Sequence, residues 1–216
     1  FEFQLALWRV DPDFRRLLTE TRAQLIAELM PLAASESARR AHFARWKECL
    51  ATPLDIEAPS LLGLIEQMGP DDWHEIVLRW NWDWGVDELN WITAQRACDR
   101  ATAVFALCAG APGEVATRHE RREDDHGWFV RDVAARLESG FYPKAELSLD
   151  LPMRQRFAFE SEMATARLTG VSPWQLPDDL VTHAGQRAHQ PKYAVSDGRA
   201  HYAYEYWLQH LAPPQR

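Results

Sequence analysis

Apolar residues recur at helical spacing along much of the chain, and this pattern predicts the first elements. One helix is predicted to end at Pro31, because a proline inside it would remove a backbone N–H and clash with the preceding turn. Its apolar face is formed by Phe14, Leu17, Leu18, Thr21, Leu25 and Leu29. A second amphipathic helix ends at the Thr52-Pro53 dipeptide and repeats the spacing with Phe43, Trp46 and Leu50.

The densest helical patterning lies between residues 61 and 112. A helix over 61–68 is predicted to stop at Gly69-Pro70, and Asp71 and Asp72 follow where acids favour a helix start. The next helix should face a core with one stripe, formed by Trp73, Ile76, Val77 and Trp80. A turn is predicted over 81–85, because Asn and Asp bond local backbone and Gly85 tolerates positive φ.

The two helices after this turn differ in their patterning. Leu89 and Ile92 mark a short amphipathic helix. The following segment, 101–109, is apolar on all sides and therefore predicts a central, buried helix. Asp99 is expected to cap this helix and Gly110 to end it.

The second half of the chain is patterned less regularly. Residues 112–126 are highly charged and predict either a solvated helix or a mobile loop. Alternation at Leu147, Leu149 and Leu151 favours one short strand or an extended arm. Three further helices are predicted from the apolar positions Trp128, Phe129, Val133 and Leu137; then Phe157, Ala164 and Leu168; and finally, after Asp197-Gly198, Ala200, Ala203, Tyr204, Trp207, Leu208 and Leu211.

These elements predict a mainly α fold, a multi-helix globular bundle with at most one or two short strands. The charged span suggests a division into an N-terminal helical region, 1–112, and a C-terminal helical region, 113–216, packed on each other as one compact unit. The longest nearly unbroken apolar run, 101–109, is about half of what a bilayer crossing requires. No membrane association is therefore expected.

Composition and charge narrow the classes of partner. Of the 216 residues, 46% are hydrophobic and 26% charged, a balance typical of folded proteins. The net charge of -8 has no accompanying basic face, so nucleic acid is not an expected partner, whereas a basic protein is. The chain has three cysteines, Cys49, Cys98 and Cys108, and no C-x-x-C pair. An odd number without this spacing argues against disulfides and a thiolate zinc site and favours a reducing, cytoplasmic compartment.

Motifs with a sharp catalytic mechanism are missing: there is no G-x-S-x-G elbow, phosphate-binding glycine loop or H-E-x-x-H pair. On a helix, His119, Glu123 and His126 would share one face and could bind a metal ion. The alternative is a solvated face, because the arginines of the same segment would repel a cation. No cofactor is predicted.

Isolated nucleophiles and imidazoles offer weaker signals. Cys108 should pack in the apolar helix, and Asp99 beside Cys98 disfavours a thiolate there. The remaining histidines have no partner recognisable in the sequence and are expected to take surface or capping positions; they are His74, His183, His189, His201 and His210.

Tryptophan and acidic residues gather around the predicted turn. The cluster consists of Asp71, Asp72, Trp73, Trp80, Asn81, Trp82, Asp83, Trp84, Asp87, Glu88 and Trp91. It could be a recognition surface, since tryptophan dominates binding hot spots and acids steer a basic partner. The alternative is that the indoles hold three helices together while Asn81 and Asp83 fix the turn.

The same stretch carries an ordered pair of motifs. It reads Asn81-Trp82-Asp83-Trp84-Gly85, and later Cys98-Asp99-Arg100-Ala101-Thr102-Ala103. Over residues 61–112 the chain resembles a bacterial domain-of-unknown-function family, number four-two-seven-four, whose signature is an Asn-Trp-Asp-x-Gly turn and a Cys-Asp-x-x-Thr-Ala helix. Val86 and the Cys108-Ala109-Gly110 ending depart from that signature, and the second departure removes a carboxylate.

The resemblance implies a helical, adaptor-like bacterial domain and assigns no catalytic activity. We therefore expect a non-enzymatic binding protein, of the immunity class, that neutralises a cognate, basic bacterial toxin by direct contact. The expected contact residues are Asp83, Trp84, Asp87 and Glu88 beside the turn, with Glu120, Glu123, Asp124 and Asp125 as a second acidic contact. Two alternatives remain open: a metal-binding protein or hydrolase using His119, Glu123 and His126, and a homodimer paired through residues 200–211.

Overall fold

The computed structural model describes residues 36–117, 126–149, 151–168, 170, 174–177, 180–182 and 185–213. The chain divides into two compact units, residues 1–51 and residues 52–216. In the first unit, α3 (Glu36–Ala51) ends directly before Thr52-Pro53, as the breaker predicts. The helix predicted to end at Pro31 lies outside the described residues.

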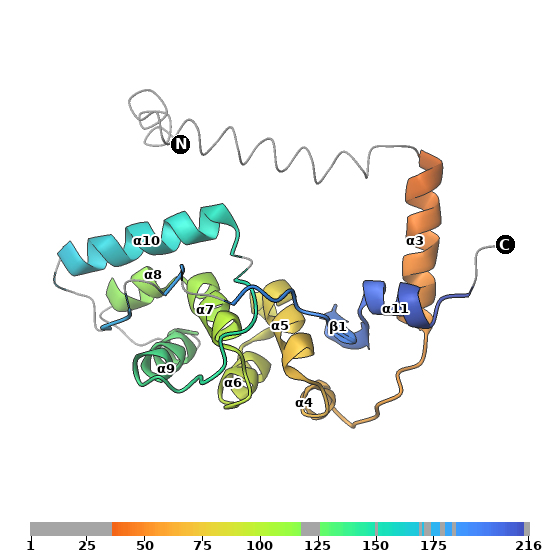
Figure 1. Cartoon of the computed structure of the whole chain (residues 1–216), viewed down its shortest axis with the longest axis horizontal. Helices are drawn as coiled ribbons and strands as arrows, with labels where there is room; N and C mark the ends of the chain where they lie inside the picture. The colour runs from red at the N-terminus through yellow and green to blue at the C-terminus, as the bar shows by residue number, and fades with distance from the viewer. Residues whose placement is uncertain are drawn as a thin grey trace. The chain divides into compact units, whose positions relative to one another are not determined.

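Most of the regular elements described in the second unit are helices, which confirms the mainly α prediction (Figure 1). One two-stranded antiparallel sheet accompanies them. In chain order the elements are α4 (Leu61–Ile65), α5 (Pro70–Arg79), the 3-10 helix η1 (Trp82–Trp84), α6 (Asp87–Thr93), α7 (Arg100–Ala109), α8 (Pro112–Thr117), α9 (Gly127–Glu138), α10 (Met153–Leu168), β1 (Tyr193–Ser196), β2 (Arg199–Tyr202) and α11 (Tyr204–His210).

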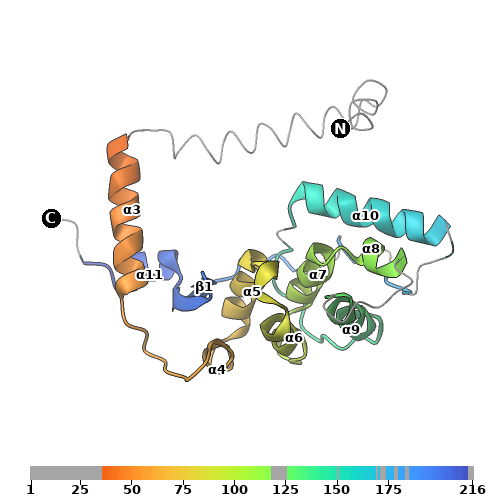
Figure 2. The same cartoon turned by 180° about the vertical axis from the view of Figure 1, so that it is seen from behind.

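Helix α7 is the centre of this unit, as its all-round apolar pattern predicts. It contacts α5, α6, α8, α9 and α10, and Figures 1 and 2 show it among these helices from opposite sides. Ala103, Ala106 and Leu107 are completely buried. Small side chains on α7 let its neighbours approach closely, so this helix sets the positions of the others.

Helix α5 lies beside α7 and also contacts β1. The predicted stripe of Trp73, Ile76, Val77 and Trp80 is buried, which confirms its orientation. Gly69 is the N-cap residue, Pro70 occupies the first turn, and the carboxylate of Asp72 accepts the Gly69 N–H at 2.9 Å. The polar side of α5 therefore begins at two acidic residues in its first turn.

The last predicted helix is wrong at its start. Ala200 lies in β2, and the helix begins only at Tyr204. Asp197 and Gly198 have φ values of 49° and 69°, the left-handed pair that a two-residue hairpin turn requires, and they join β1 to β2. An Asp-Gly turn that closes a hairpin thus replaces the predicted helix start.

The predicted apolar faces of three other helices are partly wrong. On α3, Phe43 and Leu50 are exposed. On α10, Phe157 and Leu168 are exposed, whereas Phe159 and Met163 are buried. On α9, Phe129, Val133 and Leu137 are buried as predicted, but Trp128 is 40% exposed. Because single large apolar residues are tolerated at a surface, spacing alone did not separate these from the core positions.

The alternating segment at Leu147 forms an extended arm. Leu147 is buried and makes one isolated parallel bridge with Arg187. In the described part of the chain, none of the helices combines the length and apolarity needed to cross a membrane.

Candidate functional site

The predicted turn is a fixed, partly exposed feature between α5 and α6. Asn81 caps η1, and its side-chain oxygen accepts the Asp83 N–H at 3.1 Å. Gly85 has a φ of 90°, and its carbonyl accepts the Trp80 Nε1–H at 2.8 Å. Glycine is required here because other residues rarely adopt this conformation. The turn thereby holds Trp84 in one orientation.

The indoles around the turn are divided between the core and the surface. Trp73 and Trp80 are buried, and each packs edge-on against a second indole, Trp91 and Trp84 respectively. Trp84 remains 36% exposed. Most of these rings therefore hold helices together, as the structural alternative predicts, while Trp84 offers one face to solvent.

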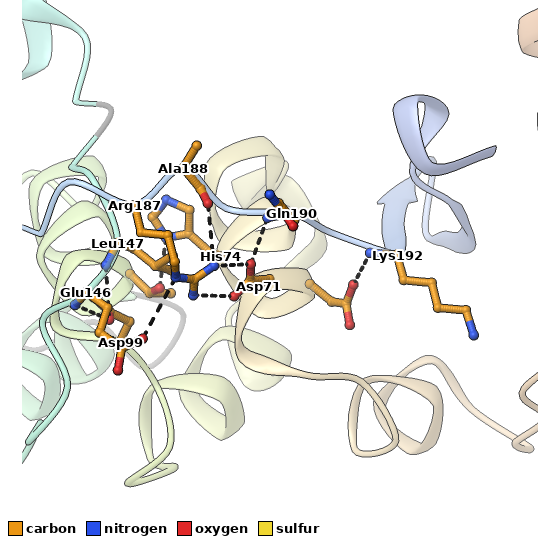
Figure 3. Close-up of polar contacts among 11 residues, drawn as sticks. Asp71, His74, Asp99, Glu146, Leu147, Arg187, Ala188, Gln190 and Lys192 are labelled. Carbon is orange, nitrogen blue, oxygen red and sulfur yellow. Dashed lines mark hydrogen bonds and ion pairs between the residues drawn. The ribbon is translucent and has the colours of Figure 1, made fainter. Parts of the chain in front are cut away.

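The acids at the start of α5 bind an extended segment, residues 185–192, which we call the strap (Figure 3). Asp71 accepts two hydrogen bonds from the Arg187 guanidinium, at 2.7 and 2.8 Å, and one from the Gln190 N–H at 2.7 Å. Asp72 accepts the N–H groups of Lys192 at 2.6 Å and Tyr193 at 2.9 Å. Both carboxylates are therefore committed to internal contacts.

The two carboxyl groups have opposite pKa shifts. Hydrogen bonds from Arg187 hold the pKa of Asp71 below its ordinary value. Burial raises the pKa of Asp72, although three backbone N–H groups favour its ionised form. Neighbouring acids of one helix turn thus differ because only Asp71 has a cationic partner.

Histidine and glutamate side chains form a polar layer where the strap meets α5. His189 Nε2 lies 3.0 Å from Glu75 Oε2, and the His189 and His74 rings are 5.0 Å apart. His74 Nδ1 lies 2.8 Å from Thr102 Oγ1 on α7. Burial opposes ionisation of Glu75, but contacts with His189 and Arg79 outweigh it and lower the pKa of this carboxyl.

Several histidines contradict the expectation of surface or capping positions. His74 and His201 are buried, and His189 is bound to Glu75. His210 is exposed, as expected, and His183 lies outside the described residues. Spacing did not reveal the burial of His74 or the pairing of His189, because their polar partners, Thr102 and Glu75, lie 28 and 114 residues away.

Asp99 joins two segments at the start of α7. Its Oδ1 accepts the Ala101 N–H at 2.9 Å, which confirms the predicted cap. Its Oδ2 accepts the N–H groups of Glu146 at 2.8 Å and Leu147 at 3.3 Å. One carboxylate therefore both starts the central helix and fixes the extended arm that carries the strap's bridge.

Both signature motifs thus have structural roles: the turn orients indoles, and the helix start supplies Asp99 and Thr102. Residues 69–112 match the model of a family described as "Domain of unknown function (DUF4274)". The similarity to that family is limited to this segment of the chain. The resemblance is confirmed, with a match that begins at α5. None of the curated proteins and none of the solved structures matches the chain.

The predicted contact residues of the DUF4274 segment lie together. Asp83 and Trp84 are on η1, while Asp87 and Glu88 form the first turn of α6. Asp83 and Asp87 are exposed, and Glu88 is half-buried. The predicted second contact lies outside the described residues and consists of Glu120, Glu123, Asp124 and Asp125.

Of the three residues of the predicted metal site, the structure describes only His126. His126 lies with its ring 6.1 Å from that of Trp82, whereas His119 and Glu123 are outside the described residues. Within the described ranges, no group of three or more His, Cys, Asp or Glu side chains is arranged to hold a metal ion. The metal hypothesis therefore stays a prediction.

The cysteines of the DUF4274 segment are buried thiols. Burial raises the pKa of Cys108 to about 12, and burial followed by the charge of Asp99 raises that of Cys98. Cys108 packs in α7 as predicted. Thiols with raised pKa values are poor nucleophiles, because little of the reactive thiolate form is present.

Proposed function

We propose that this chain acts by binding another protein and not by catalysis, as an immunity protein that neutralises a cognate bacterial toxin. Its contact surface consists of Asp83, Trp84, Asp87 and Glu88, which we call the η1 surface. The matched family has no function of its own to transfer, so the proposal rests on the geometry and charge of these residues.

The main support is how differently the acids of the DUF4274 segment are used. Asp71, Asp72, Glu75 and Asp99 all accept hydrogen bonds that hold the fold together. Among the described residues, no side-chain hydrogen bond or ion pair involves the carboxylates of the η1 surface. These acids are not required for internal contacts and remain available to a partner.

The position of Trp84 adds to this support. Its indole packs edge-on against Trp80, with ring centroids 5.4 Å apart, and stays 36% exposed. Asn81 and Gly85 fix the 3-10 helix on which it lies. A side chain that is already held in place loses little conformational entropy on binding, and tryptophan is enriched among the residues that contribute most to affinity.

Charge determines the kind of partner. An exposed indole next to carboxylates suits an arginine- or lysine-bearing surface, because a cation can contact the ring and an acid together. The net charge of -8 would attract such a partner from a distance. We therefore propose a basic toxin whose association weakens as salt concentration rises.

The test is capture of partners by the full chain from its native host, followed by affinity measurement at low and high salt. Asp83→Asn with Asp87→Asn should weaken binding and reduce its salt dependence. The control is Glu57→Gln with Glu66→Gln, which changes net charge equally at two other exposed positions. Recovery of no partner, or equal weakening by both pairs, would count against the proposed surface.

A further inference from the structure

The strap contributes almost nothing to the apolar core. Residues 185–192 read Gly-Gln-Arg-Ala-His-Gln-Pro-Lys and contain no large apolar side chain. Gln186, Arg187, Ala188 and Gln190 are exposed. Burial of apolar surface is the dominant favourable term in folding, so this segment must be held by other interactions.

Its attachments are polar and involve three acids of α5. On α5, Asp71 binds Arg187 and Gln190, Asp72 binds the Lys192 N–H, and Glu75 binds His189. The neighbouring backbone adds one short ladder, in which the Arg187 N–H donates to the Glu146 carbonyl at 3.0 Å and the Ser148 N–H to the Arg187 carbonyl at 2.8 Å. Figure 3 shows the strap crossing α5, with Asp71 bound to Arg187 and Gln190.

Apolar anchors lie on both sides of the strap. Leu180 and Val181 are buried before it, and Tyr193 and Ala194 are buried after it. The anchors can therefore stay in place while the polar segment between them leaves the surface. Segments with few buried apolar contacts and exposed backbone hydrogen bonds are those that open locally below the free energy of global unfolding.

We propose that the strap is a latch: it opens as a unit while the core around α7 stays folded, and carboxylates of α5 hold it closed. Opening hydrates His74, which is fully buried beside His189, and the buried carboxylates of Asp72 and Glu75. The inference does not depend on the proposed toxin, since it concerns contacts within the chain.

Gly185 offers a way to open the strap without altering any charge. A Cβ atom at this position would lie 1.9 Å from the Glu146 carbonyl oxygen, which is backbone and cannot rotate away. Gly185→Ala should therefore displace the strap sterically. Asp71→Ala should release it by a second, electrostatic route, because this carboxylate binds both Arg187 and Gln190.

The experiment is amide hydrogen exchange by mass spectrometry on the full chain. In both variants, peptides covering the strap should exchange about tenfold faster or more, since a hydrogen bond to a charged group is worth at least that factor. Peptides covering α7 should keep the wild-type rate. Gln186→Ala, at an exposed position next to Gly185, should match the wild type throughout.

Two results would overturn the latch. If strap and α7 peptides accelerate together in both variants, the strap opens only with the core. If strap exchange is unchanged in both, the carboxylates and the backbone approach at Gly185 do not hold it closed. Strap-specific acceleration in either variant, with α7 unchanged, supports the proposal.

Discussion

Trp82 covers the end of α7 at Gly110: a Cβ atom on Gly110 would lie 3.3 Å from Trp82 Cη2 and 2.6 Å from Val130 Cγ2. The same indole packs on Phe129, with ring centroids 5.9 Å apart. Trp82 therefore links the η1 turn to α9 across the C-cap residue of the central helix. The absence of a side chain at Gly110 makes this packing possible.

Gly110→Ala should consequently destabilise the protein by about 1–3 kcal/mol, the usual cost of overpacking. Urea unfolding of the two proteins measures this difference in the free energy of unfolding. Gly69→Ala should cost less, at most about 1 kcal/mol for alanine at an N-cap, because the nearest atom to its Cβ, Asp72 Oδ2, is at an ordinary distance of 3.7 Å. Equal losses for the two substitutions would contradict the proposed role of the Trp82–Gly110 contact.

Loss of the Asp99 carboxylate should be strongly destabilising. Asp99→Ala removes the cap of α7 and leaves the N–H groups of Glu146 and Leu147 without their acceptor. We expect a loss of about 2–4 kcal/mol, from roughly 1 for the cap and the remainder for the donors. The exposed Asp132→Ala should cost at most about 1 kcal/mol. A comparable loss at both positions would refute this ranking.

The two oxygens of Asp99 show what the sequence could and could not predict. The cap involves residues two positions apart, so the Asp before an apolar helix was sufficient to predict it. The contacts with Glu146 and Leu147 span a sequence separation of 47 and 48 residues. No local pattern specifies such a partner, since it depends on how the helices pack.

The same distinction applies to the acids of α5, whose position in the helix was predictable and whose partners were not. Asp71 and Asp72 were interpreted through the helix dipole, and they do occupy its first turn. Their main partners, Arg187 and Lys192, lie 116 and 120 residues away. The Asp197-Gly198 turn differs, because its signal is local and typical of a hairpin. The apolar spacing of the residues after it resembles a helix, and this obscures the hairpin.

Stability should fall in mildly acidic solution through His201. Burial lowers the pKa of His201 below the ordinary value of 6.5, although the Tyr202 carbonyl bound to its Nδ1–H opposes this shift. In the unfolded chain this imidazole binds a proton at higher pH than in the folded protein. The unfolded state therefore holds more protons, and the free energy of unfolding decreases as pH falls below 6.5.

Urea unfolding at about pH 7.5 and about pH 5.5 tests this linkage. His201→Gln should lose less stability between the two conditions than the wild type, because the titrating group is gone. His210→Gln changes an exposed imidazole and should leave the wild-type difference intact. If His201→Gln loses as much as the wild type, burial of His201 does not contribute to the pH dependence.

Substitutions of Trp80 and Trp84 distinguish the stability of the turn from its proposed function. Trp80 is 7% exposed and donates its Nε1–H to the Gly85 carbonyl. Trp84 is 36% exposed and packs edge-on against the Trp80 ring. Trp80→Ala should cost about 3–5 kcal/mol, as for other buried large-to-small changes. Trp84→Ala should cost about 1 kcal/mol, the value of one aromatic pair.

Binding should respond to Trp84 out of proportion to that small stability loss. If the η1 surface contacts a basic partner, Trp84→Ala should weaken capture at a temperature where circular dichroism shows the variant fully folded. Trp128→Ala removes another partly exposed indole, on α9, and should leave capture unchanged. An indole held in a fixed turn beside acids is the residue of this surface most suited to a binding hot spot. A folded Trp84→Ala protein with wild-type affinity would therefore mean that the partner contacts another surface.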